Sequence, residues 1–245
     1  MYGALPGIIQ IELDSEREED LRSYVETYLE EEIRAEAEVR DLGKFGRFLE
    51  LASIESGNTI NFSSISREIG TSHPTIASYF QILEDCLIVE RVDPITKSQS
   101  RKKLTKSSKW LFFDLGVRRM CAREGTQPNK EHLGHLFEQW VGHELIRLMC
   151  QKFPRNRLRF WRDPDGPEVD WVMETDHGYI PIEVKWSEQP QEKAARHLTV
   201  FLEEYKQDCV GVGYVVCRTP RRYLIGSHIT AVGWQELADI LNAKD

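Results

Sequence analysis

Residues 168–186, EVDWVMETDHGYIPIEVKW, contain two runs of alternating side chains with a turn between them. Alternation of apolar and polar residues indicates two half-buried β-strands. The turn places Glu174 opposite Tyr179, and counting back along both strands then sets Trp171 opposite Ile182. A slip by one residue would set acids against isoleucine and valine. The pattern therefore predicts a single register for this hairpin.

The same register predicts that Val169 faces Val184 on the apolar side and that Asp170 faces Glu183 on the other. Like charges directly opposite each other are destabilising. Either one carboxyl has a raised pKa, or a divalent cation such as Mg²⁺ binds between the two. Lys185 then lies where it can attract a phosphate oxygen or a water beside the ion. A solvated sheet face with cross-strand ion pairs is the alternative interpretation.

The composition is that of an ordinary globular protein. The 245 residues are 40% hydrophobic and 29% charged, enough for one large domain or two ordinary ones. A net charge of -8 argues against a surface that binds nucleic acid everywhere. No apolar run approaches the ~20 residues of a membrane span. Five scattered cysteines without a CxxC pair fit a reducing cytoplasm, so we expect a cytoplasmic location, no membrane contact and no disulfides.

The chain is expected to have three parts. Residues 1–38 form an acidic N-terminal helical segment, residues 39–125 a second domain and residues 131–245 a third. The pattern of the third part predicts a helix, a three-strand meander, a second helix and further strands, all packed around one central sheet. Such a sheet is usually covered on both faces, which weakens the solvated-face interpretation of the hairpin. No GxxxxGK[ST] phosphate loop is present, so we expect no ATP hydrolysis by this chain alone.

The second part has the pattern of a winged helix. Gly70 closes a short helix, Ser72 is placed to cap the next helix, and two strands flank the basic run KSQSRKKLTKSSK at residues 97–109. Helices, a turn and a two-stranded wing predict this fold, which serves both DNA binding and protein docking. The helix after Ser72 carries no Lys or Arg, so reading of base edges by this helix is not expected.

An acid on one strand followed by ExK on the next resembles the PD-(D/E)XK nuclease superfamily, which includes archaeal Holliday-junction resolvases and many restriction enzymes. That resemblance implies that Asp170 and Glu183 hold Mg²⁺ or Mn²⁺ and that Lys185 is the third catalytic residue. It also implies a supporting metal ligand, Glu138, in the helix segment HLFEQWVGHEL. The superfamily contains members that have lost activity, so the fold alone does not decide catalysis.

Further segments, among them LFEQWVGHEL, FWRDPDGPEVDWV and IPIEVKWS, resemble a bacterial and archaeal domain of unknown function that usually follows an AAA+ ATPase module. The segment GALPGII resembles the exit from such a module. The resemblance implies an AAA+ partner in cis or in trans. It also implies an α/β (α+β) fold, in which a winged helix precedes a PD-(D/E)XK nuclease-like domain with a central mixed sheet flanked by helices.

Three functions follow from these patterns. The first is a Mg²⁺-dependent nuclease that hydrolyses DNA phosphodiesters as the C-terminal part of an AAA+ ATPase-type protein. The second is a catalytically inactive adaptor for protein docking or DNA binding, and a transcription regulator ranks third. The substrate's structure and the number of copies in an assembly stay open. Candidate contacts to the DNA backbone are Arg101, Lys102, Lys103, Lys106, Arg159 and Arg162.

Overall fold

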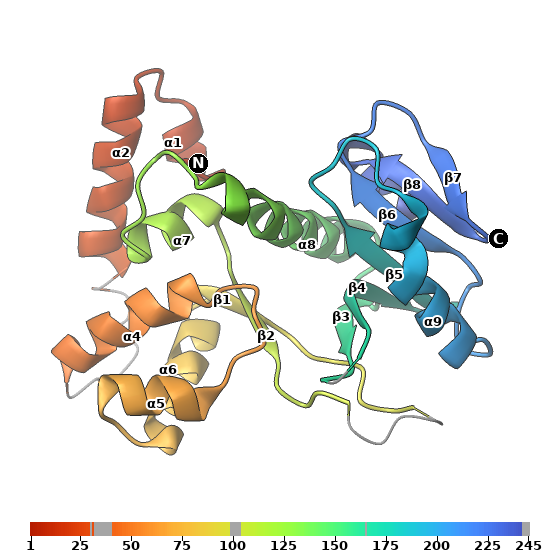
Figure 1. Ribbon diagram of the computed structural model, residues 1–245. Coiled ribbons are helices and arrows are strands. Elements are labelled where there is room, and N and C mark those ends of the chain that lie inside the picture. Colours follow the sequence, from red (N-terminus) through yellow and green to blue (C-terminus); the bar gives the residue numbers. More distant parts are fainter. Residues whose placement is uncertain (30, 32–40, 99–103, 165, 242–245) are drawn as a thin grey trace. The chain divides into compact units, whose positions relative to one another are not determined.

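The chain divides into two compact units. A computed structural model describes residues 1–29, 31, 41–98, 104–164 and 166–241. Residues 1–91 and 108–130 make up the first unit, and residues 92–107 and 131–245 the second. Figure 1 follows the chain through both. Within the described ranges, no helix has the length and hydrophobicity that a membrane crossing requires.

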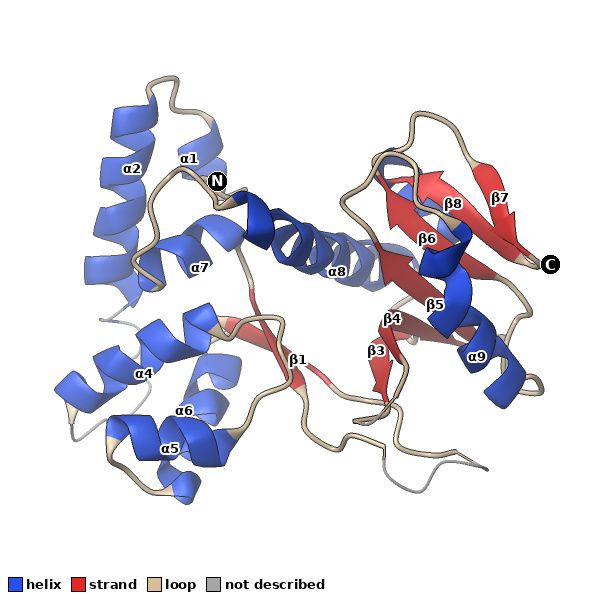
Figure 2. Cartoon of the chain, viewed as in Figure 1, coloured by secondary structure: helices blue, strands red, loops and turns tan. Residues whose placement is uncertain are grey.

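The first unit is mainly helical, with one small two-stranded sheet (Figure 2). A π-helical segment over Tyr24–Leu29 continues its second helix. The elements are α1 (Pro6–Ile9), α2 (Asp14–Ser23), α4 (Leu42–Ile54), α5 (Phe62–Ile69), α6 (His73–Asp85), β1 (Val89–Val92), β2 (Lys109–Phe112) and α7 (Leu115–Cys121).

Local signals fix the ends of the helices. Asn61 caps α5 by accepting from Ser64 N–H at 3.2 Å, and Gly70 ends that helix in the left-handed region with φ 70°. Ser72 caps α6 by accepting from Thr75 N–H at 3.2 Å. The predicted ends at Gly70 and Ser72 are therefore confirmed. Helix α7, which is capped by the buried Asp114, was not predicted from the sequence.

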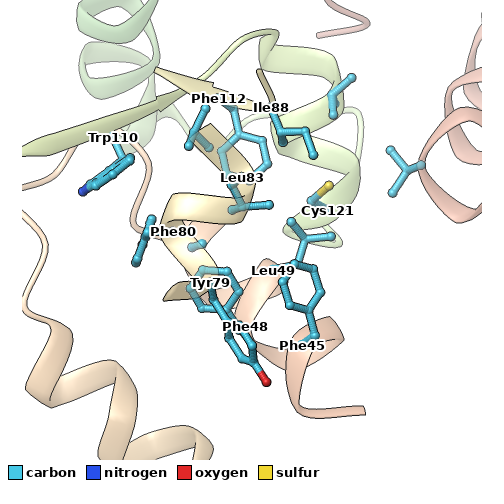
Figure 3. Packing of buried hydrophobic residues seen from close by; sticks show 14 of the residues in the cluster. Phe45, Phe48, Leu49, Tyr79, Phe80, Leu83, Ile88, Trp110, Phe112 and Cys121 are labelled. Atoms are coloured by element: carbon cyan, nitrogen blue, oxygen red, sulfur yellow. The ribbon is translucent and has the colours of Figure 1, made fainter. Parts of the chain in front are cut away.

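Aromatic side chains from the helices and from β2 form the core of the first unit. Phe48 of α4 contacts Tyr79 and Phe80 of α6, with ring centroids 5.2 Å and 4.9 Å away. Phe80 in turn contacts Trp110 of β2 at 4.9 Å. Figure 3 shows these rings in one cluster with Leu83. The buried face of α6 therefore holds α4 and β2 together.

The second unit combines helices with a six-stranded sheet. Short 3₁₀ segments precede three of its helices, at Lys130–His132, Glu192–Ala195 and Trp234–Glu236. The other elements are α8 (Leu133–Lys152), β3 (Arg157–Arg162), β4 (Glu168–Thr175), β5 (Gly178–Val184), α9 (Arg196–Glu204), β6 (Gly213–Cys217), β7 (Tyr223–Gly226), β8 (Ile229–Gly233) and α10 (Leu237–Ile240).

The sheet is mixed, with strand order β3-β4-β5-β6-β8-β7. The first three strands are antiparallel, β5, β6 and β8 are parallel, and β7 is antiparallel to β8. The expected mixed α+β architecture with a central sheet is confirmed. The sequence analysis missed β7, because the turn-rich segment before it carries little strand signal. The parallel strands β5, β6 and β8 bring their carboxyl ends to one edge of the sheet, where ligands bind in many α/β proteins.

Residues 92–107 pack with the second unit, although the sequence analysis grouped this stretch with residues 39–125. Ile95 N–H donates to Phe160 O at 2.8 Å, and Thr105 N–H donates to Arg162 O at 3.1 Å. Ile95 and Leu104 are buried in the same cluster as residues of α9, β4 and β6. Hydrogen bonds and buried apolar contacts to β3 therefore anchor both ends of the stretch.

Candidate active site

The register of the β4–β5 hairpin is the one that the sequence predicts. Glu174 pairs with Tyr179, and Trp171 pairs with Ile182. Trp171 and Ile182 are both fully buried. The paired residues end there, so the acidic segment of the hairpin lies just beyond the regular ladder.

A β-bulge explains where the prediction for this segment was wrong. On β3 and β4, Arg159 pairs with Val172 but Trp161 pairs with Val169, so two β4 residues oppose the single residue Phe160. Such a bulge interrupts the alternation of faces and redirects a side chain. Val169 consequently packs in the cluster of Val172 and α9. The predicted Val169–Val184 pair is absent from the β4–β5 register of the described residues.

The bulge places the Asp170 side chain at the open end of the ladder. Asp170 is half-buried, and its Oδ2 accepts a hydrogen bond from the backbone N–H of Val184 at 2.8 Å. A carboxylate that accepts from a backbone N–H is held in a fixed orientation. Asp170 therefore connects β4 to β5 through its side chain, where the backbone ladder has stopped.

Glu183 is buried beside a lysine. It is 5% exposed, and its Oε1 accepts from Lys185 Nζ at 2.6 Å. Its Oε2 is buried and has no hydrogen-bond partner among the residues that the structure describes. The backbone of Lys185 is fixed by donation to Val216 O of β6 at 2.9 Å, while its side chain is 41% exposed. One end of this ion pair is thus inside the protein and the other reaches solvent.

Burial is the main influence on the charges at this site. Burial raises the pKa of Glu183, against the opposing effect of Lys185, and Glu138 raises it further. The register predicted such a shift from a facing Asp170, but removal of Glu183 from water is the largest cause. Burial lowers the pKa of Lys185, yet the Glu183, Asp170 and Glu138 carboxylates outweigh it and leave the pKa raised. Three acids therefore act on one ammonium group.

Glu138 lies on α8 and acts electrostatically on Glu183 and Lys185. The indole N–H of Trp171 donates to the backbone carbonyl of Glu138 at 3.1 Å, which ties α8 to β4. A Cβ on Gly142, one turn further along, would lie 2.8 Å from the Trp171 ring. Only glycine permits this close approach of the helix to the strand. The Glu138 carboxylate also lies 4.0 Å from His135 Nδ1.

The sequence analysis missed one residue near these acids. His197, in the first turn of α9, lowers the pKa of Glu183, and its Nδ1 lies 3.1 Å from the Glu168 carbonyl oxygen. The helix itself was expected, but its angle across the sheet is not encoded in local periodicity. No sequence signal would have distinguished His197 from an ordinary surface histidine.

The donors fit a divalent ion held by few protein ligands. Mg²⁺ takes oxygen ligands and usually keeps several waters, so one or two carboxylates suffice. Glu183 Oε2, which has no hydrogen-bond partner among the described residues, and the Asp170 carboxylate held by Val184 N–H are donors of that kind. Among the described residues, no group of three or more His, Cys, Asp or Glu side chains is arranged to hold a metal. A two-carboxylate site fits the structure better than the three-ligand set with Glu138.

The candidate DNA contacts are in different environments. Arg159 Nε lies 2.9 Å from Glu174, and Arg159 Nη1 lies 3.5 Å from Asp93. Arg162 pairs with Glu168 at 3.5 Å. The exposed Lys106 lines an open pocket of about 440 Å³ together with Arg159. The remaining three candidates, Arg101, Lys102 and Lys103, lie outside the described residues.

Comparison with known proteins identifies families of unknown function. Residues 1–128 match the family described as "Domain of unknown function (DUF8612)", and residues 133–237 match "Domain of unknown function (DUF4143)". The first match spans more than half of the sequence, so the chain belongs to the DUF8612 family. DUF4143 domains are typically associated with AAA ATPase-like proteins. No curated protein matches the chain.

One solved structure is distantly similar. The crystal structure of protein VC1899 from Vibrio cholerae aligns at 12% identity with a TM-score of 0.32. The alignment covers 98% of this chain and 56% of that protein.

Proposed function

We propose that the second unit is a PD-(D/E)XK nuclease-like domain that hydrolyses DNA phosphodiesters with Mg²⁺ or Mn²⁺. The observation that carries this proposal is Glu183, a buried carboxylate with one oxygen on Lys185 and the other without a partner among the described residues. A buried, perturbed acid at the carboxyl edge of a sheet is typical of a functional site, because burial without full pairing destabilises the fold.

Each residue of the site has a distinct role in this proposal. A divalent ion bound by Asp170 and Glu183 would activate the attacking water and neutralise charge on the phosphate. The Val184 N–H keeps the Asp170 carboxylate oriented towards β5. The Lys185 ammonium, kept charged by its raised pKa, stabilises the negative charge that develops on the phosphate oxygens. Glu138 adds negative potential that favours a cation at the site.

The helical unit is proposed to be a winged helix in an AAA+ ATPase-type protein. The order α4, α5, α6, β1, β2 and the caps at Asn61 and Ser72 support that architecture. The association of DUF4143 domains with AAA ATPase-like proteins supports an ATPase module in cis or in trans. Both statements go beyond the mixed α+β fold itself.

An inactive docking adaptor is the second candidate, and one observation favours it. Helix α6, which would enter the DNA groove, carries no Lys or Arg and exposes His73, Ser78 and Gln81. Side chains of this kind provide few contacts to phosphates or to guanine edges. An adaptor would dock protein through this helix and would require no metal at Asp170 and Glu183.

A cleavage assay distinguishes the two candidates. Plasmid, single-stranded and branched DNA are incubated with the protein in Mg²⁺ and in Mn²⁺. We expect cleavage that falls at least about a hundredfold in Asp170→Asn, because the ion supplies several kcal/mol of stabilisation. Asparagine still accepts from Val184 N–H, so this variant keeps the local structure.

Matched variants make the result specific. Glu183→Gln and Lys185→Met should lose activity, whereas Glu203→Gln and Lys206→Met, at exposed positions of the same unit, should retain it. Absence of cleavage with every substrate, or equal cleavage by wild type and Asp170→Asn, contradicts the nuclease and favours the adaptor.

A further inference from the structure

Three side chains form a row at the carboxyl edge of the sheet. Val184 of β5 pairs with Val216 of β6, and Val216 pairs with Val232 of β8. Just past the ends of these parallel strands come Trp186, Arg218 and Trp234, the last of which begins the 3₁₀ segment Trp234–Glu236. Arg218 N–H donates to Ser187 O at 3.0 Å, so the segments after β5 and β6 stay hydrogen-bonded although their regular pairing has ended. We call these three residues the tryptophan row.

The two tryptophans are unusually exposed for their size. Trp186 is 38% exposed and Trp234 is 40% exposed, whereas Trp161 and Trp171 of the same sheet are fully buried. The Arg218 guanidinium carbon lies 4.4 Å from the Trp186 ring centroid, a cation–π contact. A row of exposed rings with a cation against one of them differs from the buried core packing elsewhere in the unit.

A second layer of aromatic residues supports the row from α8. The Trp140 ring meets Trp234 edge-on with centroids 5.4 Å apart, and Phe137 meets Trp186 at 5.3 Å. Edge-to-face contacts fix the orientation of the exposed rings. The rings of the row are therefore pre-organised, and a ligand that binds them would pay little entropy for ordering side chains.

The row adjoins the proposed active site through the chain itself. Trp186 directly follows Lys185, and Phe137 directly precedes Glu138. Glu183 and Lys185 thus lie at the carboxyl end of β5, the end from which Trp186 extends.

We propose that the tryptophan row binds an unpaired stretch of DNA strand, with bases stacked on Trp186 and Trp234 and a phosphate on Arg218. Base stacking on exposed rings along a cationic groove is how proteins hold single strands without reading their sequence. Bases inside a duplex are covered by their neighbours and cannot stack on protein rings. The proposal rests on the proposed nuclease and gives its substrate class: single-stranded or splayed DNA rather than intact duplex.

The charge of Arg218 decides between a nucleic acid and an apolar protein partner. Arg218 pairs with Glu188, whose side chain is 64% exposed, so a phosphate can displace that carboxylate at little cost. Moving this guanidinium, on a side chain 34% exposed, from water into an apolar protein interface would be unfavourable without a matching acid. A DNA strand complements both kinds of group, because its planar bases can stack on the indole rings and its phosphates can pair with the guanidinium.

The test measures binding separately from catalysis. A labelled single-stranded thymidine oligonucleotide and a duplex of equal length are titrated with the full chain in EDTA, with fluorescence anisotropy as the readout. We expect tighter binding of the single strand. Trp186→Ala and Trp234→Ala should each weaken it about tenfold, which corresponds to about 1.4 kcal/mol of lost stacking. Arg218→Ala should weaken single-strand binding and lower the slope of log affinity against log salt by about one, as expected for the loss of one phosphate contact.

Controls separate stacking from folding. Trp186→Phe and Trp234→Phe keep a stackable ring and should retain most of the affinity. Leu224→Ala, at a side chain 76% exposed on β7, and Arg222→Ala, at an exposed arginine, should bind as wild type does. Circular dichroism and the thermal midpoint show whether each variant is folded.

The outcomes keep this inference distinct from the proposed function. Loss of single-strand binding in the row variants supports the row even if Asp170→Asn cleaves as well as wild type, which would overturn only the catalytic assignment. Equal binding by folded row variants and wild type, or a preference for duplex, overturns the row. No binding of either DNA by folded wild type also overturns it and leaves a protein-docking surface.

Discussion

Burial from water has the largest effect on the pKa of Glu183 and of the buried thiol Cys121. Glu183 is buried and has its pKa raised, although Lys185 contacts it directly, because removal from water opposes ionisation more strongly than the ion pair favours it. The thiols follow the same rule. Burial raises the pKa of Cys121 to about 12, whereas Cys150 is exposed on α8. Position in the fold thus gives chemically identical residues different reactivity.

The cysteines therefore provide a prediction at the residue scale. With iodoacetamide at about pH 8, Cys121 would be thiolate in about one molecule in ten thousand, so alkylation should be far slower than at the exposed Cys150. Peptide mass spectrometry over a time course measures both rates. Unfolding in urea should remove the difference. Equal rates in the folded protein would contradict the burial of Cys121.

Packing between α8 and β4 holds the candidate site together at the scale of elements. The Trp171 indole lies against Gly142 and donates to the Glu138 carbonyl. These two contacts fix the distance between α8 and β4 and the position of α8 along its own axis. From that position the Glu138 carboxylate acts on Glu183 and Lys185. A small change at this contact should therefore affect both stability and the site.

Gly142→Ala tests the contact. The added Cβ would lie 2.8 Å from the Trp171 ring, and overpacking of this kind typically costs about 1–3 kcal/mol. Gly134→Ala is the matched control on the same helix, since nothing lies within 4 Å of its Cβ and alanine favours a helix by about 1 kcal/mol. Urea unfolding of both variants measures the difference. Equal or greater stability of Gly142→Ala would contradict the close packing.

The hairpin shows how much of the site could be predicted from the sequence. Alternation fixes the pairing of Trp171 with Ile182, because any other register buries acids. The bulge opposite Phe160 could not be predicted, since it depends on how β3 fits beside β4. That bulge moves Val169 to the other face and redirects Asp170 towards Val184 N–H. The residues of the site were therefore predictable, but the contact that orients Asp170 was not.

At the scale of the whole molecule, the chain passes between its two units more than once. Residues 92–107 lie between segments of the helical unit in the sequence but pack with the sheet unit. Their basic composition and flanking strands led the sequence analysis to assign them to a wing. Ile95 and Leu104 were the missed signal, because apolar residues at both ends of a basic loop indicate anchoring.

Ile95→Ala tests this grouping. Ile95 is 6% exposed, and truncating a buried isoleucine typically costs about 2–5 kcal/mol. Hydrogen exchange should show lost protection in β3 and α9 and unchanged protection in α4 and α6. Leu224→Ala, at an exposed position, should change neither. Loss of protection confined to α4 and α6 would show that residues 92–107 belong with the helical unit.

Titration calorimetry with Mn²⁺ tests the central claim most directly, because it detects the ion without requiring a substrate. Wild type and the control Glu203→Gln should release the same binding heat at one site. Asp170→Asn and Glu183→Gln should show no such heat while remaining folded. An identical Mn²⁺ isotherm for wild type and Asp170→Asn, or no binding by folded wild type, would contradict a metal site at these two carboxylates.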